Sequence, residues 1–353
     1  MTARPKVCHV YGMFRLNFED DDNLVHQRSI TELWRSLPSS LSSRSFVHEG
    51  CDVVVSMDWS PVGNHFAKQL SSYTLEMPEE DWWKIYSAEL RLPADVEISG
   101  RSKFSENKWG PEYFVESYLY DLFVILNLAL PGSADFLNVG VESASRDQLE
   151  LIKFSQYASA SLEHRERLEL SAYYFESEFR KRKHWPTLRA FDPQVVATWY
   201  YRVRSGISQV PDTPVERAEF ALLHVCRSSG RPEDLVWLFY AFESLFQTRV
   251  GENYSALLER LLLLLKPDSE QEKQLRKRFR AMYDYRSSFV HGGLQVIHPM
   301  HNEQIDNRID DQYSKIVELS LYGTRLLLAS LQRYIEENWS EVRYKTTIEP
   351  VND

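Results

Sequence analysis

The chain has 353 residues, of which 43% are hydrophobic and 26% are charged, and this composition is typical of a globular protein with one large domain or two ordinary ones. Its net charge of -10 argues against a protein that binds nucleic acid or anionic lipid over its whole surface. The three cysteines (Cys8, Cys51 and Cys226) are too widely spaced for a disulfide framework or a Cys-x-x-Cys metal site. We therefore expect a reducing, cytoplasmic location.

Several common sites and membrane segments are missing from the sequence. Glycine is scarce, at 13 residues, and the sequence has no dinucleotide-binding fingerprint, P-loop, zincin motif or nucleophile elbow. The first six residues lack the apolar core of a signal peptide, and the longest apolar stretch, 118–130, is too short and too polar to span a bilayer. We expect no cofactor, no metal site and no membrane partner.

The first half of the chain predicts an α+β domain. Alternating or β-branched runs predict strands at 6–16, 46–57, 86–98 and 135–141. Helices are expected at 111–130, which Pro131-Gly132 ends, and at 162–183. This domain covers residues 1–185, and sensing, recruitment and regulation are all open as its role.

From residue 190 onward the pattern is wholly helical. Prolines near helix starts, and glycine or proline after helix ends, set the boundaries. The expected helices span 192–204, 215–228, 232–247, 254–265, 269–291 and 310–338. The fold class is therefore an α+β N-terminal domain followed by an all-α bundle at 190–340, with a tail at 341–353.

The helix at 269–291 carries the strongest functional signal. It ends in Met-Tyr-Asp-Tyr-Arg-Ser-Ser-Phe-Val-His-Gly-Gly, in which four residues separate Arg286 from His291. Two interpretations are open: a catalytic pair, or a helix-end histidine beside the helix dipole with an arginine in a surface salt bridge. A basic run upstream is either a track for RNA phosphates or a solvated face. Its members are Lys273, Arg276, Lys277, Arg278 and Arg280. Of these, the residues expected to bind RNA are Lys273, Arg276, Lys277 and Arg280.

With these residues the chain resembles the HEPN domain family, and in particular its Apea-like branch, whose final motif is similar to Arg-Ser-x-x-Val-His-Gly. The segments Pro214–Arg227 and Leu238–Phe246 are also similar to that branch, so the resemblance covers about residues 190–340. It implies a HEPN helical bundle that acts as a metal-independent endoribonuclease and homodimer. It also implies a toxin or anti-phage defence effector, with RNA as substrate and an activator or antitoxin protein as a further partner.

The chemistry of the pair is consistent with that implication. Histidine titrates near neutral pH and can take the 2′-hydroxyl proton or give one to the leaving 5′-oxygen. Arginine can bind two phosphate oxygens as negative charge develops. The products would be 2′,3′-cyclic phosphate and 5′-hydroxyl ends, and DNA would resist cleavage.

Three further residues are expected to support the site. Ser287 stands where the family often has Asn, Asp or His, so its contribution is open. Glu243 is expected to orient Arg286 through an ion pair. Tyr285 either stacks on a base or packs against the protein.

The spacing of the pair imposes a geometric constraint. Five helical residues turn about 500°, which leaves Arg286 and His291 roughly 140° apart. Either the chain bends back beside Gly292-Gly293, or a two-fold partner supplies its own copies. We expect a homodimer in which both copies of Arg286 and His291 line one cleft. The alternative function is a non-catalytic HEPN domain that serves as a dimerisation or nucleotide-binding adaptor.

Overall fold

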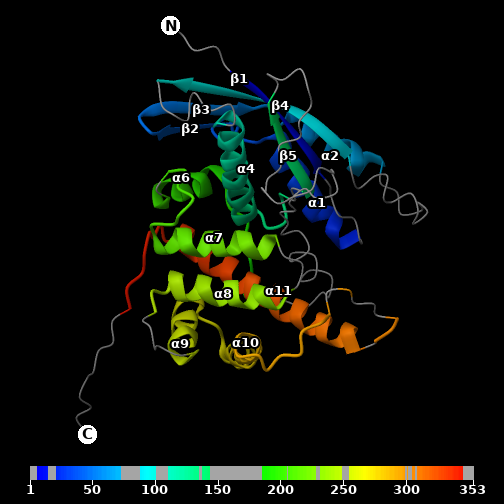
Figure 1. Ribbon diagram of the computed structural model, residues 1–353, viewed down its shortest axis with the longest axis vertical. Coiled ribbons are helices and arrows are strands. Elements are labelled where there is room, and N and C mark those ends of the chain that lie inside the picture. Colours follow the sequence, from blue (N-terminus) through cyan, green and yellow to red (C-terminus); the bar gives the residue numbers. More distant parts are fainter. Residues whose placement is uncertain are drawn as a thin grey trace. The chain divides into compact units, whose positions relative to one another are not determined.

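The computed structural model describes residues 6–14, 21–72, 88–100, 110–134, 137–143, 185–204, 206–227, 231–248, 254–298, 300, 304–306 and 308–344. The chain forms two compact units (Figure 1). The first, called the sheet unit, comprises Met1–His184, Arg189–Tyr201 and Gly206–Gln209. The second, called the helical unit, comprises Trp185–Leu188, Arg202–Ser205 and Val210–Asp353.

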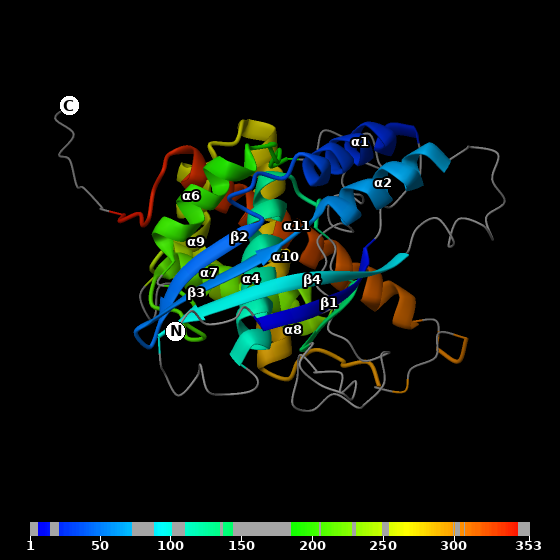
Figure 2. The ribbon, with the colours of Figure 1, turned by 90° about the horizontal axis from the view of Figure 1, so that it is seen from above.

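The sheet unit contains a five-stranded antiparallel sheet in the order β2-β3-β4-β1-β5, and Figure 2 shows four of these strands side by side. The predicted α+β character of this half is confirmed. The single strand predicted at 46–57 is wrong, because Glu49 and Gly50 both have positive φ (49° and 77°) and turn the chain into a hairpin. The strands are β1 (Lys6–Phe14), β2 (Ser43–His48), β3 (Cys51–Met57), β4 (Ala88–Ser99) and β5 (Leu137–Ser143).

One face of this sheet is packed and the other is exposed. In β4, Leu92, Ala94 and Val96 are buried while the residues between them are exposed, as a strand with one buried face requires. Helix α4 (Gly110–Ala129) covers the packed face and is buried over most of its length. It confirms the helix predicted at 111–130.

Two further helices of the sheet unit, α1 (Asp21–Arg35) and α2 (Ser60–Ser72), were not predicted. Buried tryptophans fix both of them. Trp34 Nε1 donates to the Ser133 carbonyl at 2.7 Å, and Trp59 Nε1 donates to the Tyr118 hydroxyl of α4 at 2.7 Å. Their sequences lack a continuous apolar stripe, since His26, Gln27 and Gln69 are buried alongside the hydrophobic residues. The helix predicted at 162–183 lies outside the described residues.

Helix α6 (Pro193–Val203) confirms the helix predicted at 192–204, and it groups with the sheet unit up to Tyr201. A charged contact explains this grouping. The Tyr200 hydroxyl donates to Oδ1 of Asp121 at 2.9 Å, and Arg44 Nε lies 3.4 Å from Oδ2 of the same carboxylate. The Arg44 guanidinium also lies 3.6 Å from the centre of the Tyr201 ring.

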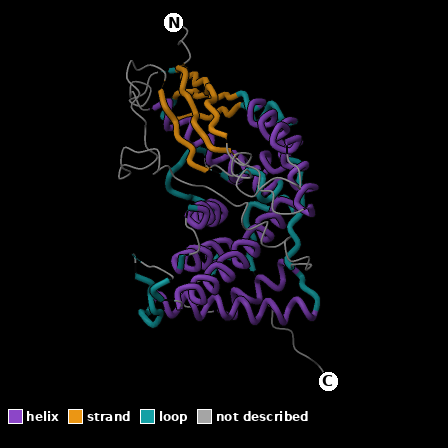
Figure 3. Tube along the Cα trace, turned by 90° about the vertical axis from the view of Figure 1, so that its right-hand side faces the viewer, coloured by secondary structure: helices purple, strands orange, loops and turns teal. Residues whose placement is uncertain are grey.

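The described residues of the helical unit form helices and loops, as Figure 3 shows by colour. The predicted helical character of the C-terminal part is confirmed, with helix ends that differ by two residues or fewer from those expected. None of the helices in the described ranges is long and apolar enough to cross a membrane. The helices are α7 (Pro214–Cys226), α8 (Pro232–Leu245), α9 (Tyr254–Leu265), α10 (Ser269–Val290) and α11 (Arg308–Glu336).

Helix α8 lies at the centre of the helical unit and packs against α7, α10 and α11. Phe239 and Phe242 of α8 contact Phe279 of α10, with ring centres 5.2 and 5.7 Å apart. Gly323 of α11 permits the close approach of its neighbours, because a Cβ there would lie 2.5 Å from Met282 Cε. This packing holds α10, the helix with the candidate catalytic pair, against the core.

Candidate active site

Helix α10 is amphipathic and begins with a capping box. The Asp268 side chain accepts the backbone N–H of Gln271 at 2.9 Å, and the Gln271 side chain accepts that of Asp268 at 3.0 Å. Leu275, Phe279 and Met282 follow at helical spacing and are buried. The rest of the helix surface is largely polar, so the sequence fixes which side of α10 faces the core.

Arg286 occupies the next position on this buried stripe. At about 100° per residue, it lies within about 40° of Leu275, Phe279 and Met282 around the helix. Its Nε is buried without a hydrogen bond, and the guanidinium makes no ion pair with any described residue. The surface salt bridge of the alternative interpretation is therefore not formed. A buried polar atom without a partner costs about 1–3 kcal/mol, so its presence calls for an explanation.

The end of α10 is a well-formed helix stop. Gly292 has a φ of 75°, and Gly293 N–H donates to the Ser288 carbonyl at 2.7 Å while Gly292 N–H donates to that of Phe289 at 3.3 Å. These two bonds form a Schellman motif. His291 is the C-cap residue, and its backbone N–H donates to the Ser287 carbonyl at 3.0 Å. Its side chain is exposed and has no hydrogen-bond partner in the described ranges.

Within one chain, Arg286 and His291 point in different directions. The helix is regular up to Val290, so the two residues keep the separation of roughly 140° that their spacing predicts. The chain does not bend back beside Gly292 to bring the pair together.

The four basic residues predicted to bind RNA are exposed and lie on the same side of α10 as His291. His291 follows Lys273 by 18 residues, or about five full turns, and the other three lie within about 60° of that line. Arg276 pairs with Glu272 at 2.6 Å and Arg280 pairs with Asp284 at 3.0 Å. Lys273 and Lys277 make no ion pair with described residues.

Two of the residues expected to support the site flank Arg286 in the sequence. Tyr285 and Ser287 are both half-buried, and burial raises the pKa of the Tyr285 phenol. The backbone carbonyl of Ser287 accepts the His291 N–H, which gives this residue a place in the geometry of the helix end.

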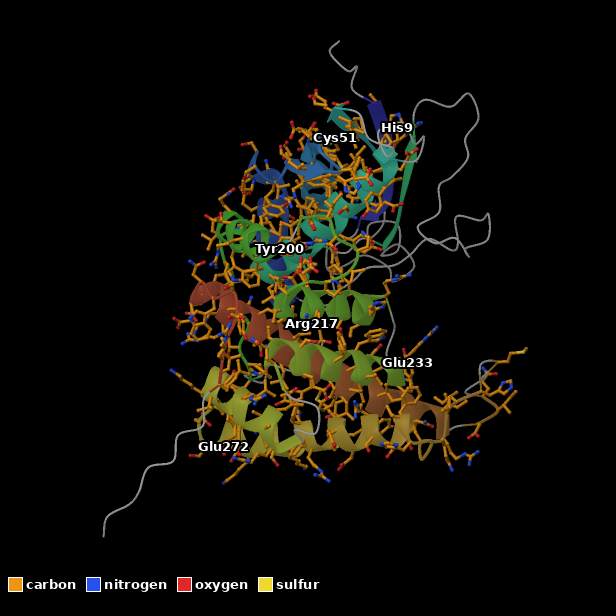
Figure 4. The ribbon with its side chains drawn as sticks, turned by 60° about the vertical axis from the view of Figure 1, so that its left-hand side comes forward. His9, Cys51, Tyr200, Arg217, Glu233 and Glu272 are labelled. Carbon is orange, nitrogen blue, oxygen red and sulfur yellow. The ribbon has the colours of Figure 1, made fainter. Side chains whose placement is uncertain are left out.

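The expected ion pair between Glu243 and Arg286 is not formed. Figure 1 shows α10 nearly end-on beside α8, which is seen from the side, so the two helices cross at a steep angle. Phe239 of α8 contacts Tyr283 of α10 near this crossing. In Figure 4, Glu233 and Glu272 mark the N-terminal parts of the two helices.

No family model, curated protein or solved structure matches the chain. Among the described residues, no three His, Cys, Asp or Glu side chains are grouped so that they could hold a metal ion. The chemistry of the site is therefore inferred from the motif and from the geometry of α10 alone.

Two further residues whose side chains could bind a ligand or transfer a proton were not identified from the sequence. Tyr254, at the start of α9, stacks on Phe279 with ring centres 5.6 Å apart, and its hydroxyl donates to the Arg276 carbonyl at 3.1 Å. Glu219 of α7 is fully buried, and neither of its carboxylate oxygens has a hydrogen bond. Burial raises its pKa to about 8, although nearby Arg204 opposes this shift. The Glu219 position lies on the apolar stripe of α7, which is the signal that could have identified it.

Proposed function

We propose that the chain is an endoribonuclease of the HEPN type, with Arg286 and His291 as its catalytic residues. The observation that carries this proposal is the end of α10, where an arginine without an ion-pair partner and an exposed histidine accompany a row of basic side chains. A purely structural helix end has no need of an arginine whose Nε is buried without a hydrogen bond.

His291 and Arg286 have distinct parts in the reaction. The 2′-oxygen forms a bond to the adjacent phosphorus as the bond from phosphorus to the 5′-oxygen breaks. One histidine takes the 2′-hydroxyl proton or donates a proton to the leaving 5′-oxygen. Arg286 binds the phosphate oxygens as their charge increases. A 2′,3′-cyclic phosphate and a 5′-hydroxyl result.

The functional unit in this proposal is a homodimer formed through the helical unit. Since Arg286 and His291 lie about 140° apart on one α10, a second copy supplies the groups that the first cannot bring together. The cell setting that we propose is a toxin or a defence effector, with an activator or antitoxin protein as a partner.

The test is incubation of the purified chain with labelled total RNA in the presence of EDTA. Cleavage is expected to fall by about 10²–10⁴ in His291→Ala, the loss that follows removal of one acid-base group. Arg286→Ala is expected to be similarly inactive. His298→Ala is a matched control, because His298 is also exposed and lies seven residues beyond the C-cap.

The outcomes separate an enzyme from an adaptor. Equal absence of cleavage by the unaltered chain and by folded His291→Ala, with a cell extract supplying any activator, would favour the adaptor function. Cleavage that strictly requires a metal ion would contradict the mechanism. Growth arrest on expression, relieved by His291→Ala but not by His298→Ala, would support the role as a toxin.

A further inference from the structure

A cluster of one arginine and two tyrosines lies beside the basic row of α10. The guanidinium carbon of Arg280 is 5.4 Å from the ring centre of Tyr254 and 5.9 Å from that of Tyr283. The two rings are themselves 5.5 Å apart and inclined at 57°. The cation thus lies over two aromatic rings that contact each other, one at the start of α9 and one in the middle of α10.

The parts of this cluster are held in place from behind. Tyr254 stacks on Phe279 at 29°, and Tyr283 packs edge-on against Phe239 with ring centres 5.7 Å apart. Arg280 Nε donates to Asp284 at 3.1 Å. The arginine is therefore held in position before a ligand binds, so little further side-chain entropy is lost on binding.

The outer side of Arg280 is open. Its side chain is 59% exposed, and its two terminal nitrogens make no hydrogen bond with described residues. A planar guanidinium presents a stacking surface, while its free N–H groups can reach phosphate oxygens. Both features suit a nucleotide whose base is not paired.

We propose that Arg280, supported by Tyr254 and Tyr283, is a stacking site for a base of single-stranded RNA. This inference rests on the proposed function and names the form of its substrate. Arg280 precedes His291 by eleven residues, or about 16.5 Å along the helix axis, on the same side of α10. A strand that follows this side of α10 would pass Lys273 and Lys277, which make no ion pair with described residues, before it reaches Arg280, and would continue from Arg280 toward His291.

Single-stranded RNA fits this site better than a duplex does. Bases in an A-form helix are stacked on each other and cannot reach a side chain, whereas unpaired bases stack readily on aromatic rings and arginine planes. A duplex could interact only through its phosphates. That difference makes the two forms of RNA distinguishable by measurement.

The same helix contains a matched control. Arg278 also lies over a tyrosine, 4.9 Å from the Tyr322 ring centre, and is 4.0 Å from Glu318. It lies about 140° away from His291 around the helix. Exchange of either arginine for lysine keeps the charge but removes the guanidinium plane.

The experiment measures binding without cleavage. Full-length chain with His291→Ala is titrated into a fluorescein-labelled single-stranded 20-mer RNA, and anisotropy gives the Kd. Addition of Arg280→Lys is expected to raise the Kd about tenfold. Addition of Arg278→Lys is expected to leave it unchanged. Circular dichroism verifies that each variant is folded.

The stacking site is overturned if Arg280→Lys binds the strand as tightly as Arg278→Lys does, if a duplex of the same sequence binds equally well, or if no RNA binds. RNA binding that depends on Arg280 without any cleavage by the unaltered chain would retain the site and reject the nuclease. If cleavage depends on His291 but Arg280→Lys leaves the Kd unchanged, the nuclease function is retained and the stacking site is rejected.

Discussion

Arg286 is a charged residue on the side of α10 that packs against the core. The stripe Leu275, Phe279 and Met282 predicts an apolar side chain one turn later, and the chain has an arginine there with a buried, unbonded Nε. Local rules are commonly broken at functional sites, where stability is lower than the fold could reach. Arg286 is therefore both a residue of the sequence motif and a residue whose buried Nε lacks a hydrogen bond.

Glu219 leads to a prediction about stability. Because burial raises its folded-state pKa to about 8 from 4.5, the unfolded chain releases this proton at lower pH than the folded chain does. The contribution of this group to stability is thus complete below about pH 4.5 and declines as the pH rises toward 8. Glu219→Gln, which cannot ionise, is expected to raise the free energy of unfolding at pH 8 by about 1–3 kcal/mol and to have little effect at pH 4.5.

Urea unfolding followed by circular dichroism at the two pH values measures this effect. Glu216, one turn earlier and equally buried, is the control. Its carboxylate accepts the backbone N–H groups of Asp212 and Thr213 at 2.8 and 2.9 Å. Glu216→Gln is therefore expected to destabilise the chain at pH 8 by about 1 kcal/mol. A stability gain of Glu219→Gln that is the same at both pH values would contradict the assignment.

At the scale of elements, the end of α10 depends on Gly292. Its φ of 75° is unfavourable for other residues, and a Cβ built there would meet no atom within 4 Å, so the cost of a side chain is purely conformational. Gly292→Ala is expected to lower stability by about 1 kcal/mol and, in the proposed nuclease, to reduce cleavage by displacing His291.

Thermal unfolding and the RNA cleavage assay test both parts of this prediction. Gly293→Ala is the matched control, since Gly293 has no positive φ and its Cβ would meet the Ser288 carbonyl oxygen at an ordinary 3.6 Å. If the two variants have equal stability and equal activity, the helix stop does not position His291.

The helical unit could be predicted from the sequence because its signals are local. Pro193, Pro214 and Pro232 each stand at a helix start, and Pro267 or Gly292 follows a helix end. The sheet unit was less predictable, since α1 and α2 bury polar side chains and the turn at Glu49-Gly50 lacks an Asn-Gly signature.

In the candidate site, too, local features could be predicted from the sequence and features set by tertiary packing could not. The position of Arg286 on the buried stripe can be deduced from the spacing of α10 alone. The absence of an ion pair between Glu243 and Arg286 could not be deduced in this way, because it depends on how α8 crosses α10, which results from tertiary contacts.

At the scale of the whole molecule, the separation of Arg286 and His291 leads to a prediction about two chains. In the proposed dimer, an arginine of one copy acts with a histidine of the other. Arg286→Ala and His291→Ala, each inactive alone, should then regain activity when their subunits exchange. Random exchange makes about half of the dimers mixed, and each mixed dimer has one of two Arg–His pairs, so about a quarter of the original activity is expected.

The cleavage rate of labelled RNA measures this recovery, and chains with two fluorophores report subunit exchange by energy transfer. Exchange of Arg286→Ala with the double variant Arg286→Ala/His291→Ala should restore no activity, because no arginine is supplied. Proven exchange of the two single variants without any recovery would place each catalytic pair within one chain. The helix end would then have to rearrange on RNA binding, since α10 as it stands holds the pair about 140° apart.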